Sequence, residues 1–241
     1  MYHRSIISKG TTHYADELLQ GFCNEKRTYG REEKTIKIYE ETINYFLSSV
    51  FNSIHIPVEE ITQESLETFI NKAKERGVRV TSINSYLHSL GVFINWLKEK
   101  GLTNVKVKFL PTQEPLPKHF TDEEINKLLK KPTKTASFTE WRSYTIACFI
   151  LATGARPATI RNIKIEDVSF SAGEIQYRHV KTKHAMSVPI SPSLCNSLRE
   201  YLHLFNIDGY LFPSVENKQL TENALKLSFK KYRKKNKTFR I

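Results

Sequence analysis

The sequence predicts a protein of two parts: an all-helical bundle, then a mostly helical α+β domain with a small antiparallel sheet. Three observations predict this arrangement. Apolar residues recur at helical spacing up to about residue 105, a proline-containing stretch follows, and short strand-like runs appear between residues 168 and 190. We therefore expect a tail at 1–10, a helical domain at 11–105, a linker at 106–119 and a second domain at 120–241.

The first domain is expected to hold four helices joined by short connections, as in a small bundle. These are a helix that opens at Tyr14–Leu19, a second at Glu33–Val50, a third at Glu64–Arg76 that Thr62 caps and Gly77 ends, and a fourth that Thr81 or Ser82 caps and Gly101 ends. Apolar residues at helical spacing define the inner faces of the second and fourth helices: Ile36, Tyr39, Ile43, Phe46 and Leu47, then Ile83, Tyr86, Leu87, Leu90, Phe93, Ile94 and Leu97.

The stretch between the domains contains Pro111, Pro115 and Pro117 and little periodicity, which is typical of an extended tether. A new helix is expected directly after it. Thr121 can act as its N-cap with Glu124 three residues later, and the acidic first turn suits the helix dipole.

The rest of the second domain is expected to alternate helices with a small sheet. It consists of a buried helix at Phe138–Thr153 that Gly154 ends, a short helix at 158–163, strands at 168–170, 174–181 and 185–190, a helix capped by Ser191 or Ser193 that runs to Phe205, and a last helix from Thr221 to about Arg233. Ile146, Phe149, Ile150 and Leu151 are the apolar residues that make the first of these helices look buried.

Composition disfavours membrane and secreted proteins. The longest apolar runs are far too short to span a membrane, and the N-terminus has no stretch suited to a signal peptide. Cys23, Cys148 and Cys195 are widely separated, so we expect buried thiols rather than disulfides or metal ligands. The sequence thus predicts a cytoplasmic protein with no membrane partner.

The net charge of +12 is concentrated in the second half of the chain. Residues 1–110 hold 15 basic and 13 acidic residues, whereas residues 111–241 hold 22 and 12. The segment Lys226–Ile241 alone carries eight basic residues and no acidic one. Such a distribution favours a polyanionic partner, most simply nucleic acid; the alternative is a basic surface that only keeps the protein soluble.

Arg156 is the first residue to which chemistry can be assigned. It follows the glycine that ends the buried helix and precedes Pro157, so packing is expected to fix its backbone. An arginine held in this way can direct two N–H groups at one phosphate and stabilise the charge that develops in phosphoryl transfer. The alternative is a surface arginine that hydrogen-bonds the preceding helix carbonyls.

Lys181 and Lys183 lie where the two expected long strands meet. A flexible ammonium group at a hairpin tip can enter a DNA groove and protonate a leaving 5′ oxygen as a general acid. The alternative is a solvated turn, because lysine, threonine and histidine are ordinary turn residues.

In this order and spacing, the segments resemble the tyrosine recombinases, or phage integrases. Residues 152–168 resemble the first-arginine motif of that family, and the hairpin that ends in Lys181–Ile190 resembles its lysine hairpin. Leu116–Ile125 resembles its domain junction, and the helical first part resembles its core-binding domain, with matches at Thr35, Tyr39 and Ser82–Leu97. The resemblance covers nearly the whole chain from about residue 11.

The resemblance implies a SAM-like core-binding bundle and a catalytic domain of the DNA breaking-rejoining type. It makes Arg156 the first catalytic arginine and Lys181 the catalytic lysine, with Lys183 as the alternative because sequence alone does not set the hairpin register. Enzymes of this family attack a DNA phosphate with a tyrosine, form a 3′-phosphotyrosyl link and release a 5′-hydroxyl. They need no metal and no nucleotide cofactor.

Two departures from the family pattern bear on activity. Thr159 stands where the family usually has a glutamate that supports the surroundings of the arginine; a threonine can hydrogen-bond but cannot neutralise a buried charge. The family also places a His-x-x-Arg motif, and later the nucleophilic tyrosine, after a segment like Thr238–Ile241, so the chain is expected to be truncated at its C-terminus. Tyr201, Tyr210 and Tyr232 precede that segment and none is assigned as the nucleophile; Tyr201 is expected to pack within its helix.

Family members clamp duplex DNA between the two domains, which makes double-stranded DNA the expected partner. The expected contacts are basic and small polar residues at helix starts: Lys34, Thr35, Arg79, Thr81 and Asn84 in the first domain, and Arg161, Lys164 and Arg178 in the second. The segment from Lys226 to Arg240 can hold DNA electrostatically or can fray. Family members assemble on DNA, whereas a monomer is expected in solution.

Three functions follow from the sequence. The first is site-specific DNA recombination or integration by a mobile genetic element, with Arg156 and Lys181 in the reaction once the absent residues are restored. The second is a catalytically inactive integrase remnant that binds DNA, which the sequence favours for the chain as written. The third, and weaker, is a DNA-binding transcription regulator with an unrelated basic domain.

Overall fold

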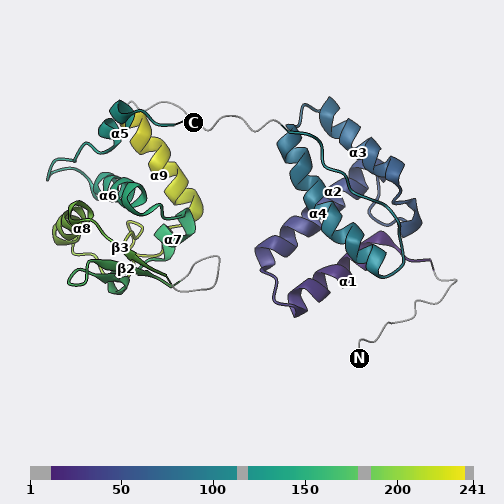
Figure 1. Cartoon of the computed structure of the whole chain (residues 1–241), viewed down its shortest axis with the longest axis horizontal. Coiled ribbons are helices and arrows are strands. Elements are labelled where there is room, and N and C mark those ends of the chain that lie inside the picture. The colour runs from purple at the N-terminus through teal and green to yellow at the C-terminus, as the bar shows by residue number, and fades with distance from the viewer. Residues whose placement is uncertain (1–11, 113–118, 179–185, 237–241) are drawn as a thin grey trace. The chain divides into compact units, whose positions relative to one another are not determined.

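The computed structural model describes residues 12–112, 119–178 and 186–236. The chain divides into two compact units, Met1–Leu116 (unit 1) and Pro117–Ile241 (unit 2), and each has its own hydrophobic core (Figure 1). Within the described ranges no helix is both long enough and apolar enough to cross a membrane. The expected tail at 1–10 lies outside these ranges.

Unit 1 is a helical bundle, as the sequence predicts. Its helices are α1 (Ala15–Thr28), α2 (Glu33–Phe51), the 3-10 turn η1 (Val58–Glu60), α3 (Gln63–Glu75) and α4 (Val80–Glu99). Figure 1 shows α2 and α4 crossing at the centre of the unit, with α1 and α3 on either side. The periodic apolar residues of α2 and α4 are all buried except Tyr86, which is half-buried.

The start of α3 confirms its prediction, whereas the start of α4 corrects one. The hydroxyl of Thr62 accepts the backbone N–H of Ser65 at 3.2 Å, and the hydroxyl of Ser65 accepts the backbone N–H of Thr62 at 3.0 Å. In α4 the N-cap is Arg79, and neither Thr81 nor Ser82 caps the helix. The fully buried Ile83 donates its N–H to the carbonyl of Arg79, so the helical turn before the first core residue must already be formed.

The chain after α4 does not behave as a tether over its first part. The side chain of Asn84 accepts the N–H of Leu110 and donates to its carbonyl, both at 2.9 Å. Val107 and Leu110 also pack against the core of unit 1. The predicted linker at 106–119 is therefore fastened to the bundle as far as Leu110, because its apolar residues find a surface to bury.

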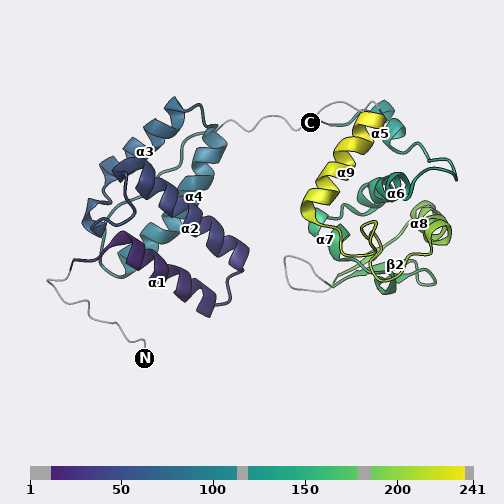
Figure 2. The same cartoon turned by 180° about the vertical axis from the view of Figure 1, so that it is seen from behind.

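Unit 2 places helices around a small sheet. Its elements are α5 (Asp122–Leu128), α6 (Phe138–Thr153), α7 (Pro157–Asn162), the 3-10 turn η2 (Ile165–Asp167), β1 (Val168–Ser169), β2 (Glu174–Tyr177), β3 (Met186–Pro189), α8 (Pro192–Phe205) and α9 (Glu222–Lys235). Within the described residues the sheet is antiparallel, in the order β1-β2-β3, with Val168 opposite Ile175 and Tyr177 opposite Met186. Figure 2 shows α6 in the middle of the unit, between α8 and α9. The fold class predicted from the sequence is confirmed.

The helix signals of unit 2 are confirmed at most positions. Thr121 and Glu124 form the expected capping box, Thr221 caps α9, and Ser191 rather than Ser193 caps α8. α6 ends at Gly154, whose φ of +64° is the left-handed conformation that glycine adopts most easily. Leu151 is a correction: its side chain is 51% exposed, so α6 buries the other side of its last turn.

The strands are shorter in the described residues than the sequence predicts. β2 stops at Tyr177 instead of Lys181, and the expected start of β3 and the turn with Lys181 and Lys183 fall in residues 179–185, outside the described ranges. α9 is helical to Lys235, so the basic segment does not fray before that point.

Candidate functional site

Arg156 lies in the tight connection between α6 and α7. Its backbone is extended and forms the N-cap position of α7, between the left-handed Gly154 and Pro157 at the first helical position. Ala155 beside it is buried, and the carbonyl of Arg156 accepts the N–H of Ile160. The side chain is exposed and makes no hydrogen bond or ion pair with any residue in the described ranges. A well-fixed backbone thus presents an unengaged guanidinium group to the surface.

The base of the predicted lysine hairpin lies against the end of α6. Tyr177, the last residue of β2, packs its ring on Phe149 with centroids 6.4 Å apart. Burial raises the pKa of Tyr177, and the nearby hydroxyl of Thr153 opposes that shift. β2 therefore ends beside the last turn of α6, from which the chain continues to Arg156.

Thr159, the predicted support of the arginine, is buried on α7. It lines a small cavity between α7, η2 and the end of β2, together with Asn162, Ile163, Asp167, Gln176, Tyr177 and Arg178. The cavity joins the helix that follows Arg156 to the strand that leads into the hairpin.

Asp167 is a buried carboxylate that sequence reasoning missed. Only 6% of the residue is exposed; Oδ2 accepts the N–H of Lys164 at 2.9 Å, and Oδ1 lies 2.5 Å from Nε of Arg178. The sequence signal for it was the acidic residue three positions after Lys164, the spacing of a helix-start hydrogen bond. Asp167 thus holds the base of the hairpin to the segment after α7.

The other predicted DNA-contact residues of unit 2 are all engaged with protein groups. Nε of Arg161 donates to the carbonyl of Leu220 at 2.7 Å. Lys164 lies 3.6 Å from a carboxylate oxygen of Glu166, and Arg178 pairs with Asp167. Arg156 differs from these three cations, because its charge is unpaired within the described residues.

The predicted DNA contacts of unit 1 fall into two separate places. Lys34 and Thr35 are in the first turn of α2, and Arg79 and Thr81 are at the start of α4. Phe22 contacts both Tyr39 and Phe93, and Tyr45 contacts Tyr86. The two helices therefore run in opposite directions, and their starts lie at opposite ends of the contact between them.

Asn84 was predicted to contact DNA, but its amide is hydrogen-bonded to Leu110 at both its oxygen and its nitrogen. The structure gives it a role in fastening the chain that follows α4.

Of the three tyrosines that precede the end of the chain, Tyr201 and Tyr232 pack in the core, whereas Tyr210 is half-buried and lies outside it. Tyr201 is fully buried, which confirms the expectation for it. Tyr232 is 5% exposed and donates its hydroxyl to the carbonyl of Leu128 at 2.6 Å. Desolvation by burial raises the pKa of both hydroxyls. A buried neutral phenol that is surrounded by protein is a poor nucleophile.

Among the described residues, no group of three or more His, Cys, Asp or Glu side chains is placed to hold a metal ion. Cys23 is buried and Cys148 and Cys195 are half-buried, and all three are free thiols.

Comparison with known proteins gives matches over both units. Residues 118–240 match the model of the phage integrase family, and residues 18–104 match that of the phage integrase N-terminal SAM-like domain. The tyrosine recombinase XerA of Pyrococcus furiosus is 29% identical over 212 residues, which covers 87% of this chain and 68% of that protein.

Two solved structures share the fold. A lambda integrase dimer bound to a COC′ core site superposes with a TM-score of 0.72 at 14% identity, over 94% of this chain and 65% of that one. The Tn1549 transposon integrase in complex with transposon right-end DNA superposes with a TM-score of 0.73 at 15% identity, over 93% of this chain and 80% of that one. The chain thus spans slightly less than two thirds of the lambda integrase chain.

Proposed function

The chain belongs to the phage integrase family of tyrosine recombinases, and on this premise we propose that it binds duplex DNA in site-specific recombination. The observation that carries the proposal is the guanidinium of Arg156, which is exposed and has no hydrogen-bond or ion-pair partner among the described residues. A further support is the excess of basic residues in the second half of the chain.

In this proposal Arg156 directs its N–H groups at the non-bridging oxygens of one DNA phosphate. Those oxygens gain negative charge as phosphorus is attacked, so a fixed guanidinium stabilises the transition state more than the ground state. The connection Gly154–Pro157 supports this role, because a backbone held at both ends limits how far the charge can move. Thr159 and Asp167 support it indirectly, since they lie between α7 and the strand that leads into the hairpin.

The hairpin supplies the general acid in the proposed reaction. Lys181, or Lys183 in its place, donates a proton to the leaving 5′ oxygen as the P–O bond breaks. Both lysines are outside the described residues, and their assignment rests on the family resemblance together with the position of Tyr177 and Met186 at the hairpin base.

The attacking tyrosine is not assigned to Tyr201 or Tyr232, because both hydroxyls are buried. Trapping of covalent protein on a nicked duplex tests this part of the proposal. Loss of a trapped product in Tyr232→Phe, with its DNA affinity unchanged, would show that Tyr232 is the nucleophile and contradict the proposal.

Binding to DNA tests the role of Arg156. The affinity for a generic duplex is measured by fluorescence anisotropy over a range of salt concentrations. We expect Arg156→Ala to weaken binding about tenfold or more, since hydrogen bonds to charged groups contribute about 1.5–3 kcal/mol. The slope of the logarithm of the affinity against the logarithm of the salt concentration should fall by about one, the value for one lost phosphate contact. Arg156→Lys should retain part of the affinity, because lysine keeps the charge without the two-pronged geometry.

Arg199→Ala is the matched control. Arg199 is an exposed arginine on α8, and Figures 1 and 2 both show α8 and α7 on opposite flanks of unit 2. Its substitution should leave the affinity and the salt slope close to those of the unaltered chain. Equal behaviour of Arg156→Ala and the unaltered chain would overturn the phosphate-binding role.

Assembly of several copies on DNA is part of the same proposal. The dimer of lambda integrase on its core site supports it. Sedimentation of the chain with and without duplex DNA tests it; we expect a monomer alone and larger complexes with DNA.

A further inference from the structure

A groove runs along α9 in unit 2, on the side of the helix that faces the first turns of α6. Its walls include Glu140 and Arg142 from α6 and Leu227, Lys231 and Lys235 from α9. Its volume is about 350 Å³, and more of its lining surface is apolar than polar. That size suits a few side chains of a bound partner.

Arg142 is the unusual residue of this groove. It is 96% buried, yet no carboxylate among the described residues pairs with it. One guanidinium nitrogen, Nη1, donates to the carbonyl of Pro213, and the group lies 5.2 Å from the ring centroid of Phe138. Nε is buried and has no hydrogen-bond partner in the described part of the chain. A buried cation with an unmet N–H is costly, and an arriving anion would offset that cost.

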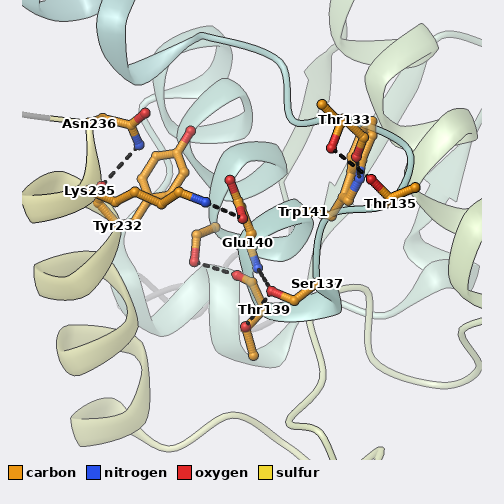
Figure 3. Close-up of polar contacts among 10 residues, drawn as sticks. Thr133, Thr135, Ser137, Thr139, Glu140, Trp141, Tyr232, Lys235 and Asn236 are labelled. Atoms are coloured by element: carbon orange, nitrogen blue, oxygen red, sulfur yellow. Dashed lines mark hydrogen bonds and ion pairs between the residues drawn. The ribbon is translucent and has the colours of Figure 1, made fainter.

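The charges around Arg142 do not cancel its own. The one acidic residue of the groove, Glu140, is already paired with Lys235 at 2.6 Å, and Figure 3 shows Lys235 reaching it from α9 beside Tyr232. Lys231 is exposed and forms no ion pair within the described ranges. Arg142 and Lys231 therefore leave the groove with unneutralised positive charge.

An apolar surface lies next to these two cations. Leu227 is 48% exposed and lines the groove one helical turn from Lys231. A ligand that fills the groove would therefore cover a leucine side chain and meet two positive charges.

We propose that this groove binds a short acidic peptide segment of a partner protein. A carboxylate of the segment pairs with the exposed ammonium of Lys231, close to the buried positive charge of Arg142, and an apolar side chain of the segment packs on Leu227. A peptide can offer a carboxylate and an apolar side chain at this spacing.

Duplex DNA fits this groove less well than a peptide. Its phosphates lie on a broad convex backbone, whereas the groove is a concave space between α6 and α9. The apolar lining also has no counterpart on a phosphate backbone. DNA binding to the groove is therefore an outcome that would contradict the proposal.

The test uses fluorescence anisotropy of the whole chain with short labelled peptides that carry glutamate and leucine in an alanine background. Matched peptides carry glutamine in place of glutamate. We expect saturable binding of the glutamate peptides only. Lys231→Glu and Leu227→Asp should each weaken it about tenfold or more, the effect of losing a charged contact or an apolar contact.

Lys230→Glu is the matched control. Lys230 is an exposed lysine of α9 that does not line the groove, so it gives the same change of net charge at a neighbouring position. Its substitution should leave peptide affinity within about twofold, because exposed charges that do not touch the ligand are screened.

Arg142→Gln is the direct variant, but Arg142 also holds the carbonyl of Pro213. The peptide affinity of Arg142→Gln is used only if the variant unfolds at the same temperature as the unaltered chain. If it does not, Lys231→Glu and Leu227→Asp decide the question. Equal binding of the glutamate and glutamine peptides, equal effects of Lys230→Glu and Lys231→Glu, or no binding of any peptide would each overturn the proposal. Displacement of the peptide by generic duplex DNA, abolished in Lys231→Glu but not in Lys230→Glu, would identify the groove as a DNA site instead.

Discussion

Among the described residues of unit 1, the buried polar ones are Thr42, Ser65 and Ser89, all of them uncharged, whereas unit 2 also buries the charged residues Arg142 and Asp167. Unit 1 fills its core with aromatic rings and aliphatic side chains; Phe22, for example, contacts Tyr39, Phe93 and Trp96. A core of this kind depends on shape and on the area removed from water, while buried charges need particular partners.

The two units also differ in how far their side-chain hydrogen bonds reach along the chain. Among the described residues of unit 1, the longest spans are those of Lys106 with Gln63, 43 residues apart, and of His55 with Asp16, 39 residues apart. In unit 2, Arg142 reaches 71 residues to Pro213, and Tyr232 reaches 104 residues to Leu128. Unit 2 is thus held together by polar contacts between distant segments, and the candidate site lies among them.

The largest effect is expected from a cavity in the core of unit 1. Phe93→Ala removes a ring that is 1% exposed and contacts Phe22 and Trp96. It should lower the free energy of unfolding of unit 1 by about 3–5 kcal/mol. Amide hydrogen exchange, followed separately in each unit, measures this. An equal loss of exchange protection in unit 2 would show that the two cores do not unfold independently.

High pH is expected to act on unit 2. Burial raises the pKa of Tyr144 to about 12 and also raises the pKa values of Tyr201 and Tyr232 above the ordinary value of 10.0. In the unfolded chain these phenols lose their protons first, so the unfolded state gains stability as pH rises above 10. The contribution of these neutral phenols to the free energy of unfolding is therefore complete below pH 10. It is lost as the pH rises through their raised pKa values in the folded state.

Denaturant unfolding of unit 2, followed by hydrogen exchange or near-ultraviolet circular dichroism at pH 8, 10 and 11, measures this effect. The free energy of unfolding at pH 8 is the reference. Tyr144→Phe removes one of the titrating groups and should reduce the loss between pH 10 and 11. A loss unchanged by this substitution would assign the alkaline effect to other groups.

Replacing tyrosine by phenylalanine at two buried positions compares a hydroxyl that has a hydrogen-bond partner with one that has none among the described residues. Tyr232→Phe leaves the carbonyl of Leu128 without its donor, and should cost about 1–3 kcal/mol of unfolding free energy. Tyr201→Phe removes a buried hydroxyl without a partner among the described residues, and should leave stability unchanged or raise it. Chemical denaturation of both variants gives the comparison; a larger loss in Tyr201→Phe would mean that its hydroxyl does have a partner.

A smaller effect is expected where unit 1 does use a polar contact between segments. Asn84→Ala removes both hydrogen bonds to Leu110 and should cost about 1–2 kcal/mol. Amide exchange at Leu110 should rise sharply, while that of the buried Ile83 should change little. Unchanged exchange at Leu110 would show that the packing of Val107 and Leu110 alone holds the chain after α4.

Much of the helical framework could be predicted from the sequence, since its signals lie within one or two turns of the chain. The N-caps at Thr62 and Thr121, the glycine that ends α6, and the apolar faces of α2 and α4 all depend on neighbouring residues. The start of α4 shows the limit of such signals. Thr81 and Ser82 are good capping residues, but the burial of Ile83 requires the helix to begin earlier.

For the candidate site, the sequence by itself determined the position of Arg156 and the family resemblance around it, because a helix end, a glycine and a proline are local features. Only the tertiary structure decided which cations are available. It paired Arg178 with Asp167, bound Arg161 to Leu220, turned Asn84 inward to Leu110 and buried Arg142 beside α9. These contacts join residues at least 11 positions apart, and a charged side chain gives no local sign of whether its partner will be water, protein or a ligand.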